Sequence, residues 1–281
     1  MQTALTMSSS KSSEPRPAVP KQKKSRIATA FKRIAILLIA AAMLFAAGWA
    51  GLLAAGQMLI AGKELPVPSS SANNGASAAI PLKEMPDYVY NAFIAVEDHR
   101  YENHIGVDFR SLARALWVDL REGGKSQGGS TVTMQLARNL FLTQDKTYTR
   151  KLKEIAIAVA LERKYTKDEI LELYLGSIYF GHGIYGLDNA ANYYFGKPIR
   201  SKTEPGRTAI GLHEAAMLAA LPKAPEHYSP VKFPEKALQR QKLVLERMFK
   251  LGLITEQEKL DALKQPLRIV PSAQVYARSQ G

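Results

Sequence analysis

Two adjacent carboxylates are the side chains in this sequence best suited to proton transfer. Glu97 and Asp98 follow residues 92–96, a run without charge and mostly apolar. Burial beside such residues raises the pKa of a carboxyl group, which makes it a useful proton acceptor near neutral pH. We therefore predict that Glu97 is a general base.

Further along the chain, two features suit an anionic group. Residues 127–131 form a glycine-rich turn that opens a helix, where free backbone N–H groups can bind an anion. Arg150, Lys151 and Glu154 share one face of a helix predicted over residues 149–165. Together with Glu97, these features indicate an enzyme that acts on a phosphate-bearing donor.

The basic helix face has a simpler interpretation. Arg150 and Glu154 have the i,i+4 spacing of an exposed ion pair, which contributes only about 0.3–0.5 kcal/mol to helix stability. The helix pattern alone does not choose between such a pair and an active-site cluster.

The net charge of +13 over 281 residues is concentrated at the start of the chain. Residues 1–33 hold eight basic residues and one acid, a net of +7, so the rest holds 38 − 8 = 30 basic and 25 − 1 = 24 acidic residues, a net of +6. This distribution favours an acidic membrane surface over nucleic acid as the partner. The absence of Cys excludes disulfides and a thiol nucleophile.

Residues 34–62 carry no charge and exceed the roughly 20 residues that span a hydrocarbon core. Basic residues crowd the segment's start, whereas only Lys63 stands close to its end. The positive-inside rule then places the N-terminus in the cytoplasm and the remainder in the periplasm or outside the cell. We predict a single-pass protein of the cell (inner) membrane.

The remaining sequence predicts a mainly α domain. Asp87, Asp108 and Thr255 are predicted helix caps, and one short hairpin is the only strand signal. A lone His182 in a glycine- and aromatic-rich segment is assigned a structural role. The predicted organisation is a disordered basic tail (1–33), a transmembrane helix (34–62), a linker (63–81), the folded domain (82–265) and a C-terminal extension (266–281).

Five segments in this order resemble the signatures of the peptidoglycan glycosyltransferase family, which comprises the glycosyltransferase modules of class A penicillin-binding proteins and their monofunctional relatives. The first reads Glu-Asp-His-Arg-Tyr-Glu-Asn-His-Ile-Gly and the second Gly-Gly-Ser-Thr-Val-Thr-Met-Gln. The segments are residues 97–106, 128–135, 150–154, 167–175 and 240–245. Five matches in register are specific, and they leave open whether the chain is monofunctional or part of a class A enzyme.

The resemblance implies a lysozyme-like α-helical fold and a reaction on lipid II. The growing glycan is the donor, and the 4-hydroxyl of an incoming lipid II attacks to give a β-1,4 link with release of undecaprenyl pyrophosphate. It implies Glu97 and Glu154 as catalytic residues, with Glu97 the base. The implied substrate-binding residues are Asp98, His104, Gly129, Ser130, Thr131, Gln135, Arg138, Asn139, Arg150, Lys151 and Lys167.

The resemblance leaves the role of Glu154 open. It either holds Arg150 and Lys151 in place or ligates a divalent cation, Mg²⁺ or Mn²⁺, on the pyrophosphate. No cofactor is required by the pattern. The implied partners are lipid II, the growing glycan strand, the membrane and other cell-wall synthesis proteins, and no nucleic acid.

Three positions depart from the family pattern. Tyr101 stands where Phe is usual, Met134 replaces the first of two glutamines, and Gly176 replaces an Asn. Because both glutamates and the basic pair are present, the departures put substrate contacts in question more than the chemistry.

Two other classes fit part of the pattern. A lysozyme-like lytic transglycosylase also needs a catalytic Glu, but it has no pyrophosphate to bind. An inactive scaffold of a cell-wall synthesis complex would tolerate the loss of Glu97.

Overall fold

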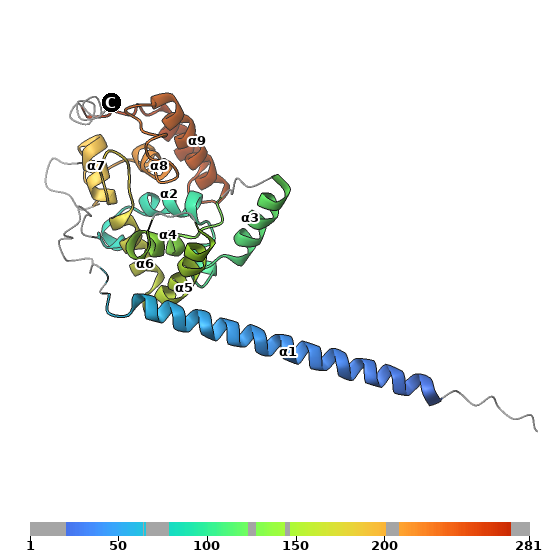
Figure 1. Ribbon diagram of the computed structural model, residues 1–281. Coiled ribbons are helices and arrows are strands. Elements are labelled where there is room, and N and C mark those ends of the chain that lie inside the picture. The colour runs from blue at the N-terminus through green and yellow to red at the C-terminus, as the bar shows by residue number, and fades with distance from the viewer. Residues whose placement is uncertain are drawn as a thin grey trace, which may run out of the picture. The chain divides into compact units, whose positions relative to one another are not determined.

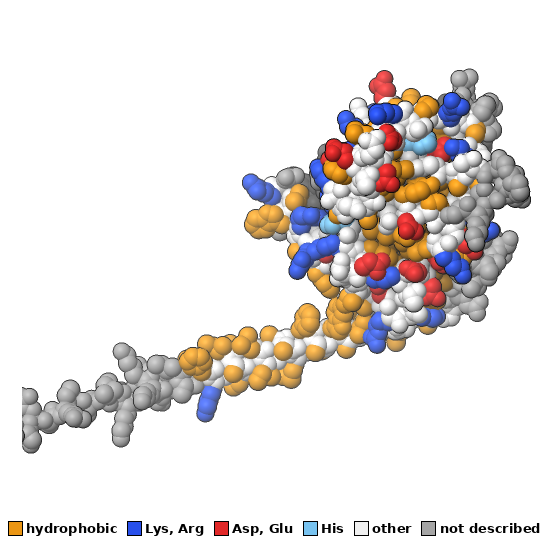
Figure 2. All heavy atoms as spheres, turned by 180° about the vertical axis from the view of Figure 1, so that it is seen from behind, with side chains coloured by type: hydrophobic (Ala, Val, Ile, Leu, Met, Phe, Trp, Pro, Cys, Tyr) orange, Lys and Arg blue, Asp and Glu red, His pale blue; other side chains and the backbone are white. Residues whose placement is uncertain are grey.

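The first element is one long helix, α1 (Lys21–Ile60). The structure, a computed structural model, describes residues 21–63, 65, 79–122, 128–143, 147–200 and 208–270. Within α1, Thr29–Ile60 is long enough to cross a bilayer, and an 18-residue window in it has a mean hydropathy of 2.3. Hydrophobic side chains cover the described part of α1 (orange in Figure 2). The predicted apolar helix is therefore present.

The boundaries predicted for this helix were wrong at its start. α1 begins at Lys21 rather than at residue 34, so the end of the predicted tail is helical. Lys, Arg and Ala are good helix formers, and no proline follows Pro20 in this stretch. Residues 1–20 lie outside the described part of the chain.

The structure divides after Ala50, and the last turns of α1 belong to the second unit, Gly51–Gly281. Gly56 contacts helix α5 (Tyr148–Lys164) so closely that a Cβ on Gly56 would overlap the carbonyl oxygen of Ala156. Glycine is thus required where the two backbones meet. Ile60, at the end of α1, is buried in the hydrophobic core.

Two groups of helices make up the folded domain (Figure 1). In one group α4 packs against α5 and α6; in the other α8 packs against α2, α7, α9 and α10, and α6 contacts α7. The bounds are α2 Asp87–Glu97, α3 Phe109–Glu122, α4 Val132–Phe141, α6 Lys167–Ser177, α7 Leu187–Phe195, α8 Leu212–Ala220, α9 Pro234–Lys250 and α10 Glu256–Lys264, with the 3-10 turns η1 Leu82–Glu84 and η2 Tyr101–Asn103.

Helix α8 is the centre of its group. From Glu214 to Ala220 every residue is buried, and four of these seven are alanines. Small side chains allow neighbouring helices to approach closely, which explains how α2, α7 and α9 all reach α8. The last residue of α2, Glu97, lies at the end of one of these neighbours.

The mainly α class is confirmed, and several predicted caps are in place. Asp108 Oδ1 accepts hydrogen bonds from the backbone N–H groups of Arg110 and Ser111, and Thr255 forms the predicted capping box. Asp87 is the first residue of α2 rather than its cap. Within the described residues, the predicted hairpin is an isolated bridge between Tyr179 and Tyr185.

The core extends beyond the predicted domain limits of residues 82–265. Ile60 and Ile80 join the core from the N-terminal side, and Leu267 and Ile269 pack against it from the other end. The backbone N–H of Val270 also donates to the carbonyl of Tyr194. Ile60 was predicted in the transmembrane helix. Ile80, Leu267 and Ile269 lie outside the periodic helices, where the sequence gives no sign of burial, so their segments were predicted to be linker and extension.

Candidate active site

Glu97 ends α2 and faces α4. Gln135 Nε2 donates a hydrogen bond of 2.8 Å to Glu97 Oε2. Burial raises the pKa of Glu97, while the hydrogen bond from Gln135 and the charges of Arg240, Lys223 and Arg138 oppose the rise. The environment is that of a carboxylate which is costly to ionise and is poised to accept a proton.

The amide of Gln135 is itself held from behind. The Tyr174 hydroxyl donates to Gln135 Oε1 at 3.3 Å, and the Tyr174 side chain is fully buried on α6. Because the carbonyl end of the amide receives this bond, its NH₂ end faces Glu97. Three helices thus fix one proton-accepting group.

A second cluster forms at the start of α5. Glu154 is only 1% exposed, and its two oxygens contact Arg150 Nε at 3.1 Å and Lys151 Nζ at 2.9 Å. Lys151 Nζ also donates to Ser130 Oγ at 2.7 Å. The interpretation of Arg150 and Glu154 as a simple surface pair is wrong, because the carboxylate is buried.

Burial lowers the pKa of Lys151, and the hydrogen bond and charge of Glu154 oppose this fall. Two cations therefore surround one buried carboxylate, so the cluster keeps excess positive charge. Such a partly dehydrated cationic site suits a phosphate group.

Arg138 connects the two clusters. It lies one turn after Gln135 on α4, and its charge lowers both the pKa of Glu97 and that of Lys151. Asn139, the next residue, is exposed. The proton acceptor and the cationic cluster therefore belong to one region, centred on α4.

Asp98 and His104, both predicted to bind substrate, contact the protein interior instead. His104 Nδ1 accepts from the Gly106 N–H, so its Nε2–H donates to Asp98 Oδ2 at 2.8 Å. The same Asp98 oxygen accepts from the Val132 N–H at the start of α4. These residues fix the loop after α2 against α4, which positions both Glu97 and Gln135.

Thr131, Gly129 and Lys167 also have internal roles. Thr131 is buried, caps α4 by accepting from the Met134 N–H, and donates to the Gly106 carbonyl. A Cβ on Gly129 would crowd Ala115. Lys167 Nζ donates to the His104 carbonyl at 2.7 Å and pairs with Glu162 at 2.8 Å. Some residues of the family signatures fix loops and others bind substrate. The sequence alone does not distinguish these two kinds of residue.

Three side chains around Glu97 were missed among the predicted site residues. These are Lys223 and Arg240, whose charges lower the pKa of Glu97, and Tyr174, which donates a hydrogen bond to Gln135. Arg240 is the first residue of the fifth signature and Tyr174 belongs to the fourth, so the signatures could have identified both as site residues. Lys223 lies in a turn after α8 and carried none.

The described residues hold no cluster of several metal-binding side chains. Within the described part of the chain, no three His, Asp or Glu side chains gather as a set of ligands. Both oxygens of Glu154 already contact cations. A divalent ion at Glu154 would lie beside the positive charges of Arg150 and Lys151, which disfavour its binding.

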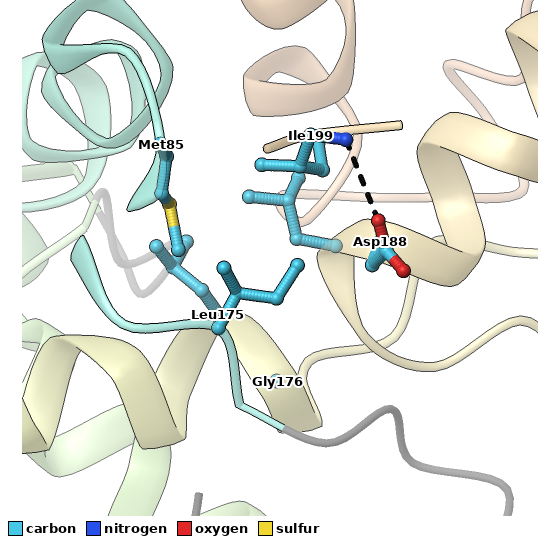
Figure 3. Close-up of a pocket in the computed structure, with 7 residues that line it drawn as sticks. Met85, Leu175, Gly176, Asp188 and Ile199 are labelled. Atoms are coloured by element: carbon cyan, nitrogen blue, oxygen red, sulfur yellow. Dashed lines mark hydrogen bonds between the residues drawn. The ribbon is translucent and has the colours of Figure 1, made fainter. Parts of the chain in front are cut away.

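The contacts described above for Glu97 and Glu154 do not involve the three positions that depart from the family pattern. Met134 is fully buried, and the Tyr101 hydroxyl donates to the Lys167 carbonyl. Gly176 borders a small internal gap of about 10 Å³ between α6 and α7, lined also by Met85 and Leu175 (Figure 3). A gap of this size holds at most one water molecule.

The predicted structural role of His182 agrees with its contacts. Its Nε2 lies 2.8 Å from Ser229 Oγ, and its ring stacks on Tyr193. His182 has a positive φ of 53°, and its backbone N–H donates to Glu226. The residue fixes the turn before α7.

Residues 66–249 match the model of a family described as Transglycosylase. The chain belongs to the transglycosylase family. A protein of Cupriavidus necator whose name assigns it to the transglycosylases is 44% identical over 78% of this chain and 91% of its own length. The resemblance stated from the five signatures is thereby confirmed.

Two relatives in the transglycosylase family are much longer than this chain. Penicillin-binding protein 1F of Bacillus subtilis is 42% identical over 81% of this chain and 32% of its own length. Penicillin-binding protein 1A of Aquifex aeolicus is 46% identical over 68% of this chain and 25% of its own length. The chain thus spans about a quarter to a third of these two proteins.

Proposed function

We propose that this chain is a peptidoglycan glycosyltransferase that polymerises lipid II into β-1,4-linked glycan strands. The observation that carries the proposal is the pairing of a desolvated carboxylate, Glu97, with the half-buried cations Arg150 and Lys151 around the buried Glu154. One is suited to accept a proton and the other to bind a pyrophosphate. Membership of the transglycosylase family supports the same reaction.

In the proposed step, Glu97 accepts the proton of the 4-hydroxyl of an incoming lipid II. The oxygen attacks the anomeric carbon of the growing strand, and the new C–O bond forms as the bond to pyrophosphate breaks. The electron pair of the broken bond leaves with undecaprenyl pyrophosphate, and the anomeric configuration inverts. Arg150 and Lys151 stabilise the charge that develops on the leaving group.

We further propose that Glu154 acts by holding these two cations, not by ligating a metal. Its contacts with Arg150 Nε and Lys151 Nζ support this role. A buried cation pair without a carboxylate would repel itself and lose its geometry.

The contacts of the cluster favour this reaction over the two alternatives. A lytic transglycosylase cleaves a glycosidic bond and has no pyrophosphate, so Arg150 and Lys151 would have no role in it. A scaffold would need neither a desolvated Glu97 nor the Gln135 and Tyr174 contacts behind it.

Exchange of Glu97 tests the proposal. In Glu97→Gln, polymerisation of purified lipid II should fall by about 10²–10⁴, the usual span for loss of a general base. Binding of lipid II should persist, because the cationic cluster is intact. Glu102→Gln, a change at an exposed glutamate of η2, should leave both unchanged. Normal polymerisation by Glu97→Gln would disprove the assignment.

We also propose that α1 anchors the chain in the inner membrane with the domain in the periplasm. The basic residues up to Arg33 and the charge-free stretch that follows them support this orientation. Protease added to intact spheroplasts should then remove the domain and spare the N-terminal tail. Protection of the domain from the protease would contradict the proposed orientation.

A further inference from the structure

A hollow of about 660 Å³ lies where α1 and α5 end. This volume falls within the range of about 300–1,000 Å³ that is usual for ligand sites. The residues around it all belong to the unit Gly51–Gly281. They are Gln57, Ile60, Ala61, Gly62, Lys63, Leu65, Lys164 and Tyr165.

Two lysines give the hollow its charge. Lys63 Nζ lies 5.3 Å from the centre of the Phe141 ring, and Lys164 Nζ lies 5.3 Å from the centre of the Tyr165 ring. Among the carboxylates of the described residues, none forms an ion pair with either lysine; Glu64 is not among those residues. A wall with two ammonium groups and apolar neighbours suits an anion that carries an apolar part.

The position of the hollow along α1 indicates what that anion is. The charge-free part of α1, residues 34–60, is roughly 40 Å long, whereas a hydrocarbon core is about 30 Å thick. Because the helix is longer than the core is thick, its last turns extend to the level of the lipid headgroups. These turns pack on α5 through Gly56. Tyr165 is half-buried there, and tyrosine is enriched at this depth.

We propose that the hollow binds the headgroup phosphate of an anionic phospholipid. Lys63 and Lys164 pair with the phosphodiester, and the Gln57 amide donates to a headgroup oxygen. The acyl chains lie against exposed apolar side chains such as Met58. The inference rests on α1 crossing a membrane and is independent of the transfer reaction. Lys164 is thirteen positions from Lys151, about 20 Å along α5, so the two anion sites are separate.

The test counts lipids that stay bound to the full chain. The protein is released from nanodiscs containing equal phosphatidylglycerol and phosphatidylcholine, and retained lipids are counted by native mass spectrometry. The wild type should retain phosphatidylglycerol in preference. In Lys63→Gln/Lys164→Gln the preference should fall about tenfold, since each lysine contributes to attraction of an anionic headgroup.

Two further variants separate a defined site from general surface charge. Lys236→Gln/Lys242→Gln removes the same charge from exposed positions of α9 and should retain the preference. Ala61→Trp fills the hollow without a change in charge and should reduce the preference for phosphatidylglycerol. Equal loss in the α9 variant, or full retention in both hollow variants, would overturn the inference.

The polymerisation assay in detergent keeps this inference distinct from the proposed reaction. Lys63→Gln/Lys164→Gln should polymerise lipid II there at the wild-type rate. A chain that retains phosphatidylglycerol but does not polymerise lipid II would disprove the proposed function and leave the lipid site standing.

Discussion

Gln135 Nε2 donates to Glu97 Oε2 at 2.8 Å, and this hydrogen bond opposes the effect of burial on the carboxylate. A base must be ionised to accept a proton, so the bond keeps more of Glu97 in its active form at a given pH. The Tyr174 hydroxyl fixes which end of the Gln135 amide faces the base.

Exchange of Gln135 should therefore change the pH dependence of the reaction. In Gln135→Met the carboxylate loses its donor, its pKa rises further, and the acid limb of kcat/KM should move to higher pH. Tyr174→Phe should move it in the same direction by a smaller amount. Rates of lipid II polymerisation measured across pH would show this, and an unmoved acid limb in Gln135→Met would contradict it.

Glu97 should reduce the stability of the fold at high pH. Because its folded pKa is raised, its contribution to stability is full below the ordinary glutamate pKa and is lost as pH rises through the folded value. Glu97→Gln should therefore match the wild type in acid and exceed it at pH 8, by about 1.4 kcal/mol for each pH unit by which the pKa is raised. Thermal melts at both pH values would measure the gain, and Glu102→Gln is the control.

Removal of Glu154 should weaken substrate binding most at high pH. Glu154 holds up the pKa of Lys151, so in Glu154→Gln this pKa should fall further and the cation should be lost at lower pH. The KM for lipid II should rise, and its alkaline limb should shift toward neutral pH. Added Mg²⁺ should not restore binding. Restoration by Mg²⁺ would favour a metal-binding role for Glu154.

The contact between α1 and α5 can be tested by two matched exchanges. Gly56→Ala should destabilise the domain by about 1–3 kcal/mol, because the new Cβ overlaps the Ala156 carbonyl. Gly51→Ala has open space around its Cβ and should gain about 1 kcal/mol from helix propensity. Thermal melts of the full chain in detergent would compare them, and equal melting temperatures would contradict the close contact.

Local signals in the sequence predicted much of the fold. The predicted caps Asp108 and Thr255 depend only on short side chains that reach backbone N–H groups two or three residues away. The face shared by Arg150, Lys151 and Glu154 follows from helix geometry alone. Such features need no knowledge of distant segments.

Contacts between distant segments were not predictable in this way. Asp98 and His104 had the residue types of substrate ligands, and only the position of α4 shows that both contact the interior. The half-buried Lys167 similarly meets Glu162 and the His104 carbonyl through folding of three segments. The burial of Glu154, which changes a surface pair into a candidate catalytic cluster, has the same origin.

The close contact at Gly56 also determines where the chain can be cut. A fragment that starts after residue 62, where the charge-free stretch ends, would remove Gly56 and Ile60 and leave the Ala156–Ala160 face of α5 open to water. Such a fragment would be prone to aggregate through that apolar face. A soluble fragment for crystallisation is better begun near Gly51, with the exposed side chains of α1 that remain, such as Met58, exchanged for polar ones.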